Sequence, residues 1–382
     1  MGKHFSLFII GLTALVASCG RPGSQSPPAE TGASVAVRYA KGFRIERHDT
    51  YTSVEVANPW DTTRLLQRYL LIDRERPLPD GLPEGTILRT PLQNVAVYTS
   101  VHASIISQLG ETGRITGVCE PQYMASLPVL EGIRAGRIAD LGMATSPDVE
   151  RMMDIGTEYI IASPFQNSHY GQAGKLGIPI IEAADYMEAH PLGRAEWGRF
   201  YGLLFHQEAL ADSIFHETEA HYLSLKALAE TAPTRPTVLS EKRYGSFWYV
   251  PSGESYIAHF FEDAGADYLF ADLPGQGSAP LAFETVLDRA IHADFWLIKY
   301  NQEEEMTYRD LRVEYTPYQH FDAYSKHAVY TCNIGKTPYY EETPIHPDYL
   351  LEDLIWVFHP DLLPGYTPRY YRKMREELRV ES

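Results

Sequence analysis

The chain has 382 residues, of which 44% are hydrophobic and 22% charged, and these proportions exclude a disordered chain and a multi-span membrane protein. A formal net charge of −17 argues against a nucleic-acid partner, because phosphates need clustered cations. Three cysteines are too few for a disulfide scaffold, so stability depends on an apolar core, and the length predicts two or three domains.

The N-terminus predicts an export signal followed by a tether. Residues 1–18 combine Lys3 with an apolar run shorter than the roughly 20 residues of a membrane-spanning helix, as in a secretory signal peptide. Small residues then precede Cys19, and this pattern resembles the lipobox of bacterial lipoproteins, which implies a lipid anchor on Cys19. An ordinary signal with a chance cysteine is the alternative. Residues 19–34 are rich in Pro, Gly and Ser and predict a flexible tether, and we expect a periplasmic location.

The rest of the chain is predicted to form an extension and two α/β lobes. Alternating apolar and polar residues predict a small antiparallel β-meander within 35–93. Short apolar strands alternate with helical stretches in 94–190 and again in 235–382, which predicts two lobes with parallel sheets. Between them, 191–234 forms a linking region with one long helix. The expected strands are Val95–Tyr98, Ile115–Val118, Tyr159–Ala162, Ile178–Ile181, Thr237–Ser240, Tyr268–Phe270, Phe295–Ile298 and Ala328–Thr331, and the expected helices include Gln207–Thr231, Ser255–Ala264, Pro280–Ile291 and His346–Phe358.

Two glutamates occupy matching positions in a faint internal repeat. Glu150 and Glu284 each begin the pattern Glu-x-apolar-apolar-Asp, and a strand follows each pattern. The spacing places both on the exposed side of a first helical turn, with Ser146 as the cap and Met153 on the buried stripe of the first helix. Considered alone, both glutamates favour the helix dipole and need no further role.

Four stretches resemble the periplasmic substrate-binding proteins of ABC importers for metal chelates. The resemblance runs from about Asn94 to Pro364. Its motifs are the opening from Asn94 to Val118, the unit from Pro147 to Ala162 with Lys175–Pro179, the start of a second lobe at Arg235–Leu239 with Tyr256–Gly265, and the ending His359–Leu363. It implies two lobes bridged by one long helix and a ligand such as a ferric siderophore, haem or vitamin B12 in the cleft. It also implies that Glu150 and Glu284 dock against arginines of an inner-membrane permease.

The loops that follow the strands are the expected ligand site, because ligands of open α/β sheets bind at the carboxyl ends of strands. These loops are crowded with aromatic residues, which grip large flat ligands. Their only cations are Arg243 and Lys336, which favours a neutral or weakly charged chelate such as a corrinoid or a hydroxamate complex. The predicted ligand contacts are Tyr98, His102, Tyr123, Gln166, Arg243, Trp248, Tyr249, Asn333 and Tyr339.

Other functions stay open at this level. His102 and His169 follow strands of the first lobe and could bind Zn or Mn directly, although no HxxxH pair or histidine-rich loop accompanies them. A chelatase-like enzyme would use a similar cleft, but the GxSxG and HExxH motifs are absent, so we expect no catalysis and no cofactor. A surface-exposed lipoprotein that captures chelates would not need the paired glutamates. We expect a monomer in which Cys119 and Cys332 are free buried thiols.

Overall fold

The N-terminal extension forms a five-stranded sheet. The computed structural model describes residues 32–376, so the predicted signal peptide, Cys19 and most of the predicted tether lie outside the described residues. Strands β1 to β4 pair antiparallel in sequence order, as the meander predicts, and β5 joins the edge parallel to β4. The strand bounds are Ala33–Val35, Phe43–Arg47, Thr52–Ala57, Leu65–Asp73 and Thr86–Thr90. In β2 the apolar residues are buried and the charged ones exposed, which holds one face against the body of the protein.

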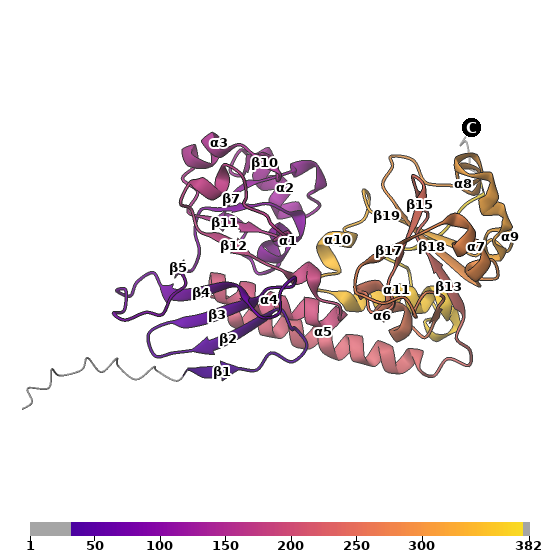
Figure 1. The fold of residues 1–382 in the computed structure, drawn as a ribbon, viewed down its shortest axis with the longest axis horizontal. Helices are drawn as coiled ribbons and strands as arrows, with labels where there is room; N and C mark the ends of the chain where they lie inside the picture. Colours follow the sequence, from indigo (N-terminus) through magenta and orange to yellow (C-terminus); the bar gives the residue numbers. More distant parts are fainter. Residues whose placement is uncertain (1–31, 377–382) are drawn as a thin grey trace, which may run out of the picture. The chain divides into compact units, whose positions relative to one another are not determined.

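The first lobe is an open sheet of five parallel strands in the order β12-β11-β6-β7-β8 (Figure 1). Its central strands are apolar on both faces because helices cover both sides. The strands are β6 (Val95–Val97), β7 (Ile115–Val118), β8 (Ala139–Asp140), β11 (Tyr159–Ala162) and β12 (Ile180–Glu182), with a small hairpin of β9 (Gly142–Met143) and β10 (Ser146–Pro147). The helices are α1 (Ser100–Gln108), α2 (Leu127–Arg134) and α3 (Val149–Asp154).

Helix α3 begins later than predicted. Ser146 belongs to strand β10, and Asp148 caps the helix instead, accepting a hydrogen bond of 2.8 Å from the backbone N–H of Arg151. This shift also exposes Met153, 65% of which is accessible, whereas Met152 is fully buried. The prediction that Ser146 caps the helix and Met153 lies on the buried stripe is therefore wrong.

Two helices connect the lobes. α4 (Pro191–Phe205), which the sequence did not predict, and α5 (Glu208–Ala229) form an antiparallel hairpin that turns at His206 in a left-handed conformation. Almost all of α4 is buried, and it shares one apolar core with the N-terminal sheet and the first lobe. α5 continues alone to the second lobe, where Tyr222 donates a 2.6 Å hydrogen bond to Asp263. This is the single linking helix of the predicted architecture.

The second lobe repeats the α/β pattern. Its sheet has the order β16-β13-β18-β19-β20, and only β20 runs antiparallel. The strands are β13 (Thr237–Ser240), β16 (Asp267–Tyr268), β18 (Phe295–Tyr300), β19 (Val329–Asn333) and β20 (Arg372–Lys373). The helices are α6 (Tyr256–Asp263), α7 (Phe283–Ala290), α8 (Tyr308–Glu314), α9 (Asp322–Ser325), α10 (Tyr339–Glu342) and α11 (Pro347–Phe358). The predicted fold class, two α/β lobes around a linking helix with an N-terminal antiparallel sheet, is confirmed.

One predicted loop is regular structure. The segment after β13 forms an antiparallel hairpin of β14 (Arg243–Tyr244) and β15 (Phe247–Pro251), and β15 also pairs antiparallel with β17 (Ser278–Leu281). The helix expected from Pro280 therefore begins only at Phe283. The two-residue alternation of a strand turns Trp248 into the core of the lobe and leaves Tyr249 exposed.

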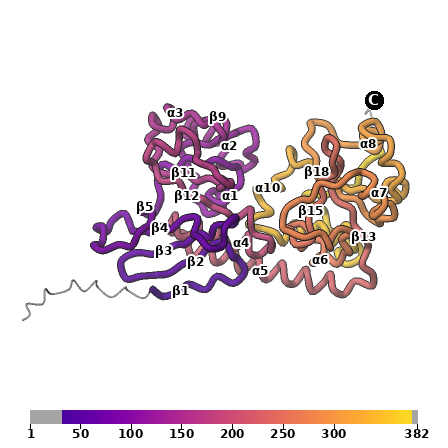
Figure 2. The backbone as a smooth tube through the Cα atoms, viewed as in Figure 1, coloured from indigo at the N-terminus to yellow at the C-terminus, as the bar shows by residue number. Residues whose placement is uncertain are grey.

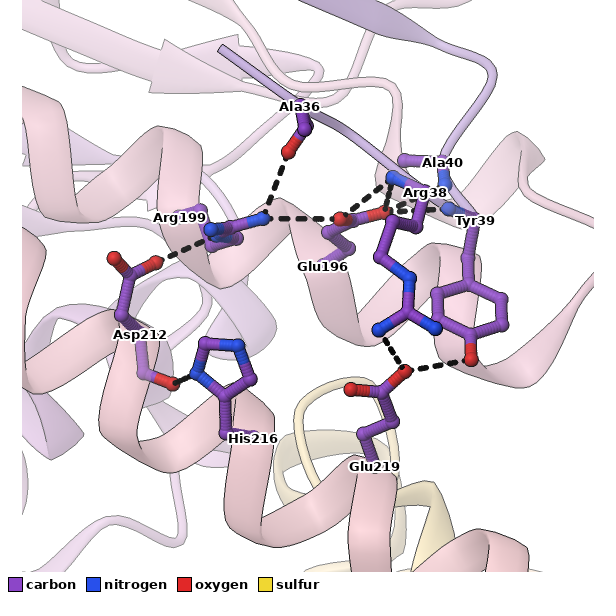
Figure 3. Close-up of polar contacts among 9 residues, drawn as sticks. All are labelled: Ala36, Arg38, Tyr39, Ala40, Glu196, Arg199, Asp212, His216 and Glu219. Carbon is purple, nitrogen blue, oxygen red and sulfur yellow. Dashed lines mark hydrogen bonds and ion pairs between the residues drawn. The ribbon is translucent and has the colours of Figure 1, made fainter.

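The extension is held to the α4–α5 hairpin by buried carboxylates, which Figure 3 shows. Glu196 of α4 is fully buried and accepts hydrogen bonds of 2.7 to 3.0 Å from the backbone N–H groups of Arg38, Tyr39 and Ala40. Arg199 donates a further bond of 3.2 Å to the same carboxylate. Within residues 32–376, no helix has the length and apolar character needed to cross a bilayer.

Candidate functional site

A cavity of about 550 Å³ opens at the carboxyl ends of strands β13 and β18 in the second lobe. This is the edge of a parallel sheet at which α/β proteins bind their ligands. Helix α10, the start of α6 and the hairpin of β14 and β15 form the walls, and one residue of α4 reaches in from the linking region. The cationic and tyrosine side chains that line the cavity include those of Arg194, Lys242, Arg243, Tyr249, Tyr256, Lys299, Tyr339 and Tyr340.

Four cations line this cavity, which corrects the sequence-based count of two. Arg194, Lys242 and Lys299 join Arg243, whereas Lys336 lines a separate cavity beside β20. Lys299 pairs with Glu241, and Lys242 lies 2.6 Å from Glu314. Arg243 stacks on the ring of Tyr315, 3.9 Å from its centroid. The inference of a neutral ligand from a shortage of cations therefore loses its basis.

The buried carboxylate of Asp185 fixes the orientation of Arg194. Its Nε donates a hydrogen bond of 3.1 Å to Asp185, and its guanidinium lies over the ring of Tyr256 at 5.3 Å. Burial favours the neutral form of Asp185, but the charges of Arg194 and His102 keep the pKa of this carboxyl below its usual value. The other oxygen of Asp185 lies 3.5 Å from Nε2 of His102. Because one edge of the guanidinium is fixed in this way, its orientation in the cavity wall is preset.

The aromatic residues of the cavity offer both apolar surface and one free hydroxyl. Tyr249 and Tyr340 are exposed, while the side chain of Tyr339 is only 3% accessible. The hydroxyl of Tyr339 is buried and has no hydrogen-bond partner among the described residues. Burial raises the pKa of Tyr256 to about 12, so this phenol is neutral and donates to the carbonyl oxygen of Thr343 at 2.9 Å. A buried hydroxyl without a partner is costly, which favours a ligand atom at this position.

Three of the nine predicted ligand contacts line this cavity, namely Arg243, Tyr249 and Tyr339. Tyr98 and His102 are buried within the first lobe, and Trp248 is fully buried with its indole N–H bonded to the carbonyl oxygen of Ser240. Tyr123 and Gln166 are exposed on the first lobe. Asn333 lines the cavity beside β20, where its amide donates to the carbonyl oxygen of Gln302. The prediction that Trp248 contacts the ligand is wrong in this structure, because strand alternation points it into the core.

Arg194, Tyr256 and Lys299 were missed by the sequence analysis. Lys299 directly follows the predicted strand Phe295–Ile298, so extending the search by one residue would have found it. Tyr256 begins a predicted helix, but nothing in its local pattern indicated a cavity. Arg194 lies in the linking region, far in sequence from every strand end of the second lobe, and only the hairpin of α4 and α5 brings it there.

The two glutamates of the internal repeat are exposed in the first turns of α3 and α7. Neither Glu150 nor Glu284 makes an ion pair or side-chain hydrogen bond within residues 32–376. Both carboxylates are thus available to a partner.

Other candidate groups are placed less favourably. Cys119 and Cys332 are free and buried, and burial raises the pKa of each thiol to about 12, so both are protonated at neutral pH. His102 is fully buried and His169 exposed, and no group of three His, Cys, Asp or Glu in the described range could hold a metal ion. A second cavity, of about 630 Å³, is lined by residues of the N-terminal extension and of both lobes, including Ala184 just after the end of β12.

Comparisons with known proteins agree with this geometry. Residues 95–333 match the model of a periplasmic binding protein family. An uncharacterized lipoprotein of Methanocaldococcus jannaschii is 24% identical over 376 residues, which cover 92% of this chain and 88% of the relative. The haem complex of S. aureus IsdE is 14% identical, with a TM-score of 0.54 over 69% of this chain and 98% of that one. An Fe³⁺-hydroxamate transport protein of Saccharomonospora viridis is 17% identical, with a TM-score of 0.52 over 70% and 94%.

The two solved structures establish a shared fold, and the family model covers more than half of the sequence. It spans the parallel strands of both lobes and the cavity wall from Lys242 to Lys299. This chain therefore belongs to the periplasmic binding protein family.

Proposed function

We propose that this protein is the solute-binding lipoprotein of an ABC importer and that it carries an anionic metal chelate, such as haem or a ferric siderophore, in the cavity of the second lobe. The observation that carries the proposal is the grouping of Arg194, Lys299 and the unpartnered hydroxyl of Tyr339 around one cavity. Guanidinium, ammonium and phenol groups all donate hydrogen bonds to anionic oxygens such as carboxylates and catecholates. Exposed tyrosines would cover the apolar faces of the chelate.

The volume of the cavity lies in the range that accommodates a small organic ligand. Ligand pockets of about 300 to 1,000 Å³ accommodate drug-sized molecules, and this cavity holds about 550 Å³. Cobalamin has one anionic phosphodiester and otherwise neutral amides around its ring, whereas haem has two carboxylates and a ferric catecholate is more strongly anionic. Although Arg194, Lys242 and Lys299 each pair with an acid, Arg243 has none among the described residues, so we rank cobalamin below haem and ferric catecholates. Direct binding of Zn or Mn has no support from a three-ligand cluster in the described range.

Fluorescence titration of the purified protein tests this proposal. The probes are haemin, a ferric tris-catecholate, a ferric hydroxamate, cyanocobalamin and molybdate. We expect haemin or the catecholate to bind one to one and to be recovered chemically unchanged. Arg194→Gln should weaken that binding about tenfold, equivalent to about 1.4 kcal/mol, while the exposed-residue control Arg309→Gln should not. Conversion of the chelate to a product would support an enzyme instead, and binding of cobalamin alone would refute the anionic class.

The lipid anchor is a separate part of the proposal. The lipoprotein relative and the sequence around Cys19 both support attachment to a membrane outside the cytoplasm. We expect Cys19→Ser to move the protein from the membrane fraction to the soluble fraction while ligand affinity stays the same. Continued membrane association of that variant would contradict lipidation at this cysteine.

A further inference from the structure

Helix α10 contacts the cavity and the first lobe at the same time. Tyr339 and Tyr340 line the cavity, whereas the next residue, Glu341, reaches the first lobe. Figure 2 shows the backbone of α10 between α1 and the strands of the second lobe, and α10 packs against α1. The side chain of Glu341 is buried, and its Oε1 accepts a hydrogen bond of 2.7 Å from the backbone N–H of Ala125.

Glu341 binds the backbone that leads into helix α2 of the first lobe. The N-cap residue of α2 is Ser126, but its side chain makes no capping bond and donates instead to Ser107 at 3.0 Å. The carboxylate of Glu341 accepts from the backbone N–H groups of Ala125 and Ser126, so a residue of one lobe holds the segment that leads into a helix of the other. A second bridge runs nearby, where Nε2 of His346 lies 2.8 Å from the amide oxygen of Gln108.

We propose that Glu341 is a positioning residue that couples occupancy of the cavity to the separation of the two lobes. This inference rests on the proposed function, because it assigns to α10 the contact between ligand and lobe. A ligand that engages Tyr339 and Tyr340 fixes α10, and a fixed α10 presents Glu341 to the start of α2. Ligand binding in the cavity then favours the contact between the lobes, and that contact favours ligand binding to the same extent.

The same contact makes lobe closure depend on pH. Burial raises the pKa of Glu341 to about 7, the amides of Ala125 and Ser126 oppose this rise, and the charge of Glu342 adds to it. Glu342 is in turn bonded to Tyr370 and lies 3.8 Å from Arg369, whereas the neighbouring side chains of α1 and α2 at this contact, Gln108, Ser107 and Ser126, are uncharged. His346 also faces this contact, 4.0 Å from Asp348, and burial lowers its pKa, so protonation of this imidazole acts against the effect of Glu341 as the pH falls.

The direction of this pH dependence follows from the difference in the pKa of Glu341 between the joined and the separated lobes. When the lobes separate, the carboxyl of Glu341 returns to solvent, where the pKa of a glutamate is about 4.3. The joined state therefore binds the proton more tightly than the separated state does, and it gains stability as the pH falls from above 7 toward the solvent pKa. Replacing Glu341 by glutamine keeps a carbonyl acceptor for the amide of Ala125 and removes the titration.

Pulsed electron spin resonance between labels on the two lobes measures this coupling without any ligand. Met143→Cys and Val313→Cys supply exposed label sites in a Cys19→Ser background, because Cys119 and Cys332 are fully buried. At pH 8.5 and pH 6 we compare the otherwise unchanged protein with Glu341→Gln, Glu341→Ala and the exposed control Glu131→Gln on α2.

We expect the population at the shorter distance to rise at least twofold from pH 8.5 to pH 6 in the protein that retains Glu341 and in Glu131→Gln. Glu341→Gln should keep the shorter distance at both pH values, and Glu341→Ala should shift to the longer one. Adding haemin at pH 8.5 should raise the shorter population in the protein that retains Glu341 and in Glu131→Gln, but not in Glu341→Ala. If Glu341→Gln retains the full pH dependence, or if Glu341→Ala leaves the distances unchanged, the coupling is refuted. If the distances change with pH as expected but haemin does not change them, the result would count against the proposed ligand and not against the contact of Glu341 with the first lobe.

Discussion

The unpaired hydroxyl of Tyr339 lowers the stability of the ligand-free protein. It lost its hydrogen bonds to water on burial and gained none from the described residues. Most buried polar groups in folded proteins are paired, so an exception at the wall of a cavity marks a position where a ligand atom completes the site.

Tyr339→Phe therefore has opposite effects on stability and binding. We expect the free energy of unfolding to rise by about 1 kcal/mol, because an unpaired buried hydroxyl is removed. Affinity for the anionic chelate should fall about tenfold, measured by the fluorescence titration. The matched control is Tyr324→Phe, which removes a hydroxyl bonded to the carbonyl oxygen of Tyr308 at 3.1 Å and should lower stability by about 1 kcal/mol without changing affinity. Equal stability changes in the two variants would contradict this interpretation.

At the scale of single elements, the hairpin of α4 and α5 decides how the parts are joined. α4 packs among the N-terminal sheet and the first lobe, α5 continues to the second lobe, and Arg194 in the first turn of α4 enters the cavity. The extension depends on this hairpin, because a single buried carboxylate satisfies three successive backbone N–H groups.

Glu196→Ala should therefore destabilise the protein strongly. It leaves three backbone donors without an acceptor in a buried site and removes one partner of Arg199, which keeps its bonds to Asp212 and to the carbonyl oxygen of Ala36. We therefore expect the free energy of unfolding to fall by about 3 kcal/mol in urea denaturation. Glu217→Ala on the exposed face of α5 is the control and should change stability by less than about 0.5 kcal/mol. Cleavage of the extension by a protease should accelerate only in the first variant. A loss below about 1 kcal/mol would mean that the extension is held mainly by its apolar face.

At the scale of the whole molecule, the two lobes carry matching exposed acids. Glu150 and Glu284 stand in equivalent first turns of α3 and α7, without ion pairs inside the described chain. Two carboxylates on separate rigid lobes could fix the register of a large docked partner through paired arginines. This extends the proposed function to the permease.

Glu150→Ala with Glu284→Ala should leave chelate affinity unchanged, because both residues lie outside the cavity. We expect transport of haemin into proteoliposomes that contain the permease to fall at least tenfold. Asp154→Ala with Asp288→Ala removes the acids four residues further along the same exposed segments and serves as the control for net charge. Unimpaired transport by the glutamate variant would refute the docking role.

The sequence by itself determined the fold class, the central strands and the exposed positions of Glu150 and Glu284. These features follow from local patterns, since short runs such as Val95–Val97 are apolar on both faces and the helical period of 3.6 residues separates a buried stripe from the exposed positions. Tertiary structure alone decided that Arg194 joins the cavity, that Trp248 leaves it, and that Glu341 binds the backbone before a helix more than 200 residues away in the chain. Such contacts depend on how elements pack and in which register strands pair, and neither is encoded in the spacing of neighbouring residues.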